Sequence, residues 1–147
     1  MQTKSEKLPT LFLLIYNVLM IISYCSYLFL ENTRLSQSQH WLTEGTITQE
    51  DVKSIDQIGK WTSISETVFL ILFVISIIYV MYMYQKKPAR RFFIMNAALF
   101  IGLALISYMV SLHSSMPIGN LLQPIIIPSV LLIIFFIYNL WKKRSEN

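Results

Sequence analysis

Four long runs of apolar residues constrain this chain more than any other feature. They cover residues 8–30, 64–84, 92–112 and 125–141, and the one Asp, Glu, Lys or Arg inside them is Glu66. A helix over residues 64–84 would be about 31 Å long, close to the roughly 30 Å hydrocarbon core of a bilayer. With 54% hydrophobic and 14% charged residues, the chain has too little polar surface to cover four such helices in water. We therefore expect residues 1–147 to form a single all-α membrane domain with four transmembrane helices in an antiparallel bundle.

The distribution of positive charge predicts how the chain is oriented. The N-terminal tail, residues 85–91 and the C-terminal tail together hold nine Lys and Arg residues, against three in residues 31–63. Short loops rich in Lys and Arg stay in the cytoplasm, so we expect a multi-pass protein of the cytoplasmic (inner) membrane with both termini inside. The formal net charge of +4 then reflects orientation and contact with anionic lipid, and no nucleic-acid partner is expected. The residues that set the orientation are Lys86, Lys87, Arg90 and Arg91.

Residues 31–63 are predicted to form an outer loop that contains one short extracytoplasmic amphipathic helix. Thr48 is a suitable N-cap, Asp51 stands where a capping box needs a carboxylate, and Gly59 is placed to end the helix. Its apolar face would lie on the bilayer surface, cap the bundle, or dock a partner. The residues of this face are Val52, Ile55 and Ile58.

Polar side chains inside the first and third spans follow helical spacing. Tyr16, Ser23 and Tyr27 fall on one stripe, with Asn17 and Tyr24 beside it. Lipid offers such groups no partners, so the stripe is expected to face other helices, with a ligand-lined cleft as the alternative. In the third span, Asn96, Leu103 and Ser107 share a face that suits the bundle interior. The opposite face carries Ala98 and Gly102, a spacing found where helices or protomers pack closely.

Glu66 is the ionisable residue nearest the membrane interior. It lies about 7 Å along the helix axis from Trp61, just below the outer interface. A carboxylate there can be structural, since it lies in the first turn of the span, or functional, with Lys60, Arg34 or His113 as the expected partner. The tryptophans that flank the spans are expected to anchor the interfaces: Trp41, Trp61 and Trp141.

The chain lacks the residue patterns of most membrane enzymes and transporters. Cys25 is its one cysteine, which excludes a disulfide or a two-cysteine redox relay. The sequence contains no HExxH, GxSxG, CxxC or GxGxxG pattern, and His40 and His113 share no helical spacing. No span places a charge at the bilayer midplane, where ion-coupled transporters need one. We expect no enzyme activity, no metal and no cofactor.

One segment resembles a known group of proteins. Trp61-x4-Glu66 at the start of a span, then a basic turn, then Phe92-Phe93-Ile94 opening the next span, resembles a family of small uncharacterised four-span bacterial inner-membrane proteins. The resemblance covers residues 61–100 and implies termini in the cytoplasm; the family's more elaborate aromatic and basic ending is here reduced to Trp141–Arg144. Residues 44–51 resemble a helical hairpin module of bacterial membrane-associated proteins, which implies a protein-contact role.

These observations favour a protein that acts by binding. We expect an accessory, regulatory or immunity-type subunit with the outer loop as its contact surface, and with a membrane-protein partner or a second copy of itself within the lipid bilayer. The candidate polar residues are Glu66, Asn17, Asn96 and His113. The alternative is an oligomeric, holin-like pore or a small transporter.

Overall fold

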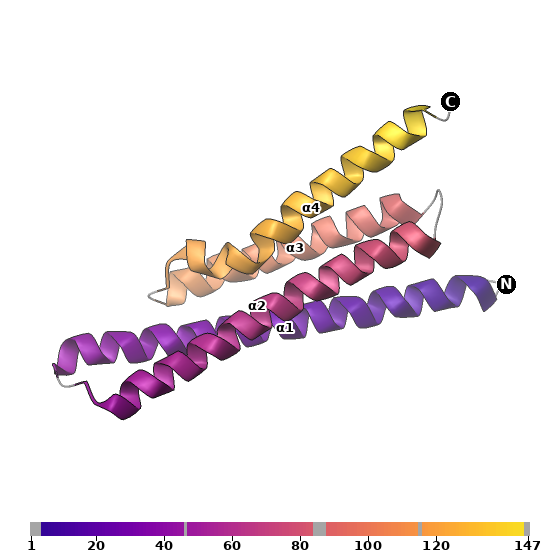
Figure 1. Cartoon of the computed structure of the whole chain (residues 1–147). Helices are drawn as coiled ribbons and strands as arrows, with labels where there is room; N and C mark the ends of the chain where they lie inside the picture. The colour runs from indigo at the N-terminus through magenta and orange to yellow at the C-terminus, as the bar shows by residue number, and fades with distance from the viewer. Residues whose placement is uncertain (1–3, 46, 84–87, 115, 146–147) are drawn as a thin grey trace.

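Four long apolar helices make up the fold (Figure 1). The computed structural model describes residues 4–45, 47–83, 88–114 and 116–145, and this part of the chain contains no strand. Each helix is long and apolar enough to cross a membrane, which confirms the prediction of an all-α, multi-pass membrane protein. The helices are α1 (Lys4–Glu44), α2 (Gln49–Met83), α3 (Pro88–His113) and α4 (Ile118–Ser145).

Successive helices run in opposite directions. α1 begins and α4 ends at one end of the bundle, which we name the termini end. The turn from α1 to α2 and the turn from α3 to α4 lie at the opposite end, the hairpin end (Figure 1). α1 packs chiefly along α2, and α3 chiefly along α4. The molecule is therefore built from two helical hairpins packed side by side.

The prediction of an outer loop over residues 31–63 is wrong. α1 continues to Glu44 and α2 begins at Gln49, so nearly all of this segment is helical. The 41 residues of α1 are about 61 Å long and the 35 residues of α2 about 52 Å, compared with about 39 Å for α3 and 42 Å for α4. Figure 1 shows the excess length at the hairpin end, where α1 and α2 extend past α3 and α4. Residues 31–63 form what we name the α1–α2 projection.

The tip of the projection is a tight turn with a cap on each side. Gly45 has a φ of 72°, the left-handed conformation that commonly ends a helix, and its N–H donates to the Trp41 carbonyl at 3.2 Å. The predicted capping box is confirmed: the Thr48 N–H donates to Asp51 Oδ2 at 3.0 Å, and the Asp51 N–H donates to Thr48 Oγ1 at 3.3 Å.

The predicted short amphipathic helix is not a separate element. Thr48 caps α2 itself, and α2 passes through Gly59 without interruption. A glycine inside a helix lowers helix stability by only about 1 kcal/mol relative to alanine. Packing of α2 against α1 is enough to offset this loss. Gly59 was wrongly predicted as a helix end because that prediction considered only the low helix propensity of glycine. It left out the contact of this segment with α1.

The segment between α3 and α4 is also shorter than predicted. The apolar runs at 92–112 and 125–141 leave residues 113–124 between two spans, but α4 already begins at Ile118 and contains Pro124 and Pro128 in its interior. Figure 1 shows α4 changing direction after its first turns. Proline inside a helix removes a backbone donor and displaces the carbonyl four residues before it, which accounts for the bend.

Large side chains fill the interior between the two hairpins. Phe73 of α2 lies between Phe92 and Phe100 of α3, with ring centroids 6.5 Å and 5.4 Å away. Phe92 in turn contacts Phe135 of α4 at 5.8 Å. Apolar side chains on the outer faces of all four helices are exposed, as expected for surfaces that contact lipid. The single chain thus encloses a packed core.

Candidate functional site

The polar stripe of α1 contacts the other helices. Tyr16 donates to Asn96 Oδ1 of α3 at 2.7 Å, and Asn96 Nδ2 donates to the Phe92 carbonyl at 3.0 Å. Ser23 donates to the Ser65 carbonyl of α2 at 2.9 Å. Tyr16, Ser23 and Asn96 are all buried. The prediction that the stripe joins helices is confirmed, and Asn96 is placed in the interior as expected.

Asn17, a candidate polar residue, lies beside the stripe and is partly buried. Its Nδ2 donates to the Leu13 carbonyl at 2.8 Å and lies 3.7 Å from Met95 Sδ of α3. Its Oδ1 is buried and has no hydrogen-bond partner among the residues that the structure describes. Because the Asn17 amide bonds mainly to its own helix, Asn17 links the helices less strongly than Asn96 does.

Two tyrosines of α1 bond to the bent start of α4. Tyr27 donates to the Asn120 carbonyl at 2.6 Å. In a regular helix this carbonyl would accept from the N–H of residue 124, but residue 124 is proline and has none. Tyr24 donates to the next carbonyl, that of Leu121, at 3.0 Å and also bonds to Ser107. Tyr27 thus supplies the donor that the proline removes from the helix ladder, and Tyr24 adds a second bond to the same turn of α4.

Glu31 continues this stripe, and the sequence analysis did not single it out. It is 2% exposed and accepts from Arg34 Nη2 at 2.6 Å and from Asn120 Nδ2 of α4 at 3.4 Å. Its Oε2 is buried and unpartnered within the described part of the chain. The signal was available, because Glu31 follows Tyr27 by four residues and so stands on the same helical face. It was missed because a loop was expected after residue 30.

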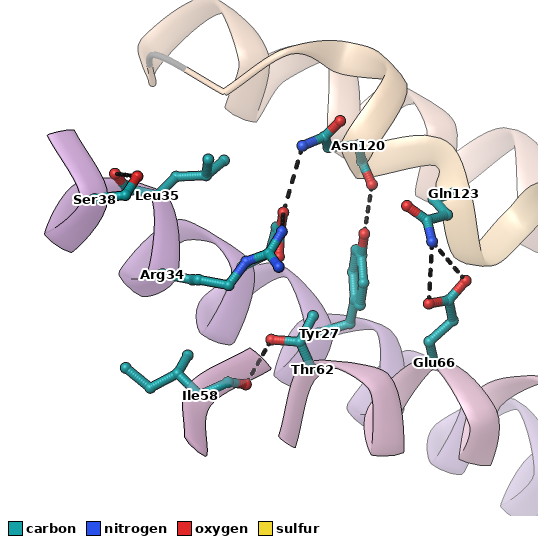
Figure 2. Close-up of polar contacts among 10 residues, drawn as sticks. Tyr27, Arg34, Leu35, Ser38, Ile58, Thr62, Glu66, Asn120 and Gln123 are labelled. Atoms are coloured by element: carbon teal, nitrogen blue, oxygen red, sulfur yellow. Dashed lines mark hydrogen bonds and ion pairs between the residues drawn. The ribbon is translucent and has the colours of Figure 1, made fainter. Parts of the chain in front are cut away.

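Glu66, the charged residue predicted within a span, pairs with α4. Gln123 Nε2 donates to its two carboxylate oxygens, at 3.2 Å and 3.3 Å (Figure 2). The expected partners of Glu66 were wrong, because each of them bonds elsewhere. Arg34 pairs with Glu31, Lys60 pairs with Asp56 at 2.5 Å, and the exposed His113 bonds through Nδ1 to the Met109 carbonyl at 2.9 Å.

Together these contacts form what we name the hairpin-end cluster. Asn120 and Gln123, one turn apart on α4, bond to Glu31 of α1 and to Glu66 of α2. Figure 2 shows Gln123 pointing toward Glu66. Amide-to-carboxylate hydrogen bonds are charge-assisted and stronger than neutral ones. The described residues contain no group of three His, Cys, Asp or Glu side chains that could hold a metal ion. The cluster holds the start of α4 in one position against α1 and α2. Its members are Tyr27, Glu31, Arg34, Glu66, Asn120 and Gln123.

The other predicted residues lie apart from the cluster. Of the predicted contact face, Val52 is exposed, while Ile55 and Ile58 are half-buried. The anchors Trp61 and Trp141 are exposed and Trp41 is half-buried. Of the basic turn, Arg91 is exposed in α3, whereas Lys86, Lys87 and the side chain of Arg90 lie outside the described residues.

Comparisons with known proteins identify no relative. The chain matches no protein-family model, no curated protein and no solved structure. The resemblance of residues 61–100 to small four-span inner-membrane proteins stays a prediction. Function therefore has to be argued from the geometry of this chain.

Proposed function

We propose that this protein is a binding subunit of the bacterial inner membrane, of an accessory, regulatory or immunity type. The α1–α2 projection is its contact surface. The observation that carries this proposal is exposed apolar surface on a part of the molecule beyond the apolar spans. Leu42 is 86% exposed, Ile47 60% and Val52 55%. Exposed apolar groups away from lipid are typical of protein contact sites.

The projection is suited to binding because its shape is fixed in advance. Both of its arms are continuous with transmembrane helices, and its tip is capped on each side at Gly45 and Thr48. The Thr48 hydroxyl, and then its N–H, hold the pKa of Asp51 below its usual range, so the capping carboxylate stays ionised to a lower pH than a free aspartate would. A preformed surface loses little conformational entropy when a partner binds.

The direction in which the projection points follows from the basic residues. With the termini end in the cytoplasm, the projection lies on the extracytoplasmic side. A cysteine at Ser54, which is exposed in the projection, should react with a membrane-impermeant thiol reagent added from outside, whereas a cysteine at Ser145 should not. The opposite labelling pattern would overturn this orientation.

The packing of the helix interior gives less support to the alternative, a pore, than to the binding function. Tyr24, Phe69, Phe73 and Phe92 are fully buried where a path along the axis of a single chain would have to run. A conducting path would therefore have to form between chains. Solute flux through reconstituted vesicles tests this alternative directly.

The test of the binding function removes the apolar surface of the projection. Leu42, Ile47 and Val52 are replaced together by serine, and a photoreactive group at Gln57 reports contact in native membranes. We expect the triple variant to stay folded and inserted but to lose the crosslink to its partner. The matched control replaces exposed Ser54 by asparagine on the same helix. An unchanged crosslink in the triple variant would refute the projection as the contact surface.

A further inference from the structure

An open groove runs between α1 and α2 at the base of the projection. Its volume is about 640 Å³, and it is lined by Arg34 from α1 and by Ile55, Gly59, Lys60 and Ile64 from α2. The apolar residues on which the binding function rests, Leu42, Ile47 and Val52, do not line it. Its shape and charge point to a ligand.

The groove lies at the height where the apolar spans end. Apart from Glu66, the charged residues of α2 extend only as far as Lys60, and the apolar run begins at Ile64. Trp61, exposed beside the groove, is a residue type that prefers the boundary between hydrocarbon and headgroups. The groove therefore opens at the level of lipid headgroups.

The charges in the groove are of both signs. Arg34 uses Nη2 for Glu31, and its guanidinium has further donors. Lys60 pairs with Asp56, but their side chains are 71% and 62% exposed, and ion pairs so open to water are weak. The two cations suit a phosphate, and the Asp56 carboxylate suits an ammonium group.

An apolar track continues from the groove along α2. Ile64, Val68 and Ile71 are exposed at i, i+4 and i+7, so they lie on one face of the helix. An acyl chain can lie along this face while its headgroup occupies the groove. A free phosphate or a soluble metabolite would make no use of the track.

Gly59 keeps the groove open. A methyl group built on it would lie 3.9 Å from Arg34 Cδ, an ordinary contact, so alanine would fit there without a clash. A larger side chain at this position would fill the space beneath Arg34. The effect of Gly59 is therefore to leave space between α1 and α2, and not to end a helix as predicted.

We propose that this groove binds a phospholipid with an ethanolamine headgroup. The phosphodiester lies against Arg34 and Lys60, the ammonium group against Asp56, and one acyl chain follows the track from Ile64. The lipid binds at the junction of span and projection, and Arg34, which also pairs with Glu31 of the hairpin-end cluster, is the residue that the two share.

Native mass spectrometry of the detergent-purified protein with added lipid tests this proposal. We expect phosphatidylethanolamine to be retained in preference to phosphatidylglycerol. Lys60→Gln should lower its retention about tenfold, the effect of one hydrogen bond to a charged group. Asp56→Asn should remove the preference between the two lipids. Lys53→Gln, exposed on the same helix and outside the groove, is the matched control and should change nothing.

Two further measurements keep the result interpretable. Gly59→Leu should block binding while circular dichroism shows an intact helical fold, whereas Gly59→Ala should retain most of it. Equal retention of the two lipids by the unaltered protein, or equal losses in Lys60→Gln and Lys53→Gln, would overturn the proposal. Full displacement of the lipid by inorganic phosphate would also overturn it, because it would show a free-anion site. Full displacement by glycerophosphoethanolamine would overturn it as well, because it would show a headgroup site that makes no use of the apolar track.

Discussion

The two hairpins meet in one way in the middle of the bundle and in another at the hairpin end. In the middle, α2 and α3 touch through the rings of Phe73, Phe92 and Phe100. At the hairpin end, hydroxyl and carboxylate groups of α1 and α2 bond to the backbone and amide groups of α4. Ring packing supplies close contact with weak directional preference, whereas hydrogen bonds fix one position of α4.

The prolines of α4 account for the location of the polar contacts. Pro124 leaves the Asn120 carbonyl without its helical donor, and a membrane offers no water to replace it. Tyr27 supplies that donor from α1. The hairpin end thus carries polar contacts where α4 is interrupted, whereas in the middle aromatic rings pack beside the Tyr16–Asn96 hydrogen bond between α1 and α3.

Breaking the aromatic contact should have the largest effect. Phe73→Ala leaves a cavity between α2 and α3, and we expect it to lower the free energy of helix dissociation by roughly 3 kcal/mol. This value is at the low end of the range for soluble proteins. When the helices separate, Phe73 contacts lipid and not water, so burying it contributes less free energy than in a soluble protein. An SDS titration in mixed micelles measures the loss. Val74→Ala, next in sequence but exposed, is the control and should change little.

The sequence predicted much of this architecture because apolar runs and polar stripes are local signals. The spacing of Tyr16, Ser23 and Tyr27 placed them between helices, and Asn96 and Ser107 lie in the interior as their shared face indicated. The capping box at Thr48 and Asp51 also lies where it was predicted. In each case the pattern depends on residues within a few turns of one another.

The failures involve information that no single stretch carries. Residues 31–44 are polar enough to suggest a loop, and their helicity depends on packing against the partner arm of the same hairpin. Nothing local in the sequence showed that Glu31 would meet Asn120, 89 positions away. Gly45, three residues before the N-cap at Thr48, was the one signal that could have indicated a tight turn between two long helices.

Removing the buried carboxylate should rank second. Glu31→Leu takes away the acceptor of Arg34 and Asn120, and we expect a loss of about 2 kcal/mol, typical for hydrogen bonds to a charged group. The loss stays moderate because Arg34 is partly exposed and can reach water. The same SDS titration measures it. Glu50→Leu, which removes an exposed carboxylate from the same projection, is the control, and an equal loss in both variants would contradict a special role of Glu31.

A double-mutant cycle tests whether Tyr27 compensates for the proline. Tyr27→Phe should cost about 1 kcal/mol, because the Asn120 carbonyl loses its donor inside the membrane. Pro124→Ala restores a backbone N–H to that carbonyl. In the Pro124→Ala background, the cost of Tyr27→Phe should therefore fall to near zero.

The outcome of the cycle separates compensation from simple packing. If Tyr27→Phe costs the same in both backgrounds, the tyrosine hydroxyl does not act as the replacement donor. Tyr108→Phe, on the exposed face of α3, should have no effect in either background.

The smallest effect is expected at Glu66. In Glu66→Gln the new amide oxygen can still accept from Gln123, and Gln123 is exposed while Glu66 is only half-buried, so the loss should stay below about 0.5 kcal/mol. The informative readout for this variant is solute flux in reconstituted vesicles, because helix packing hardly changes. If Glu66 only positions α4, flux stays at background in both proteins and the crosslink from the α1–α2 projection is kept. If flux is present and collapses in Glu66→Gln, the carboxylate lines a conducting path, and the proposal of a binding subunit fails.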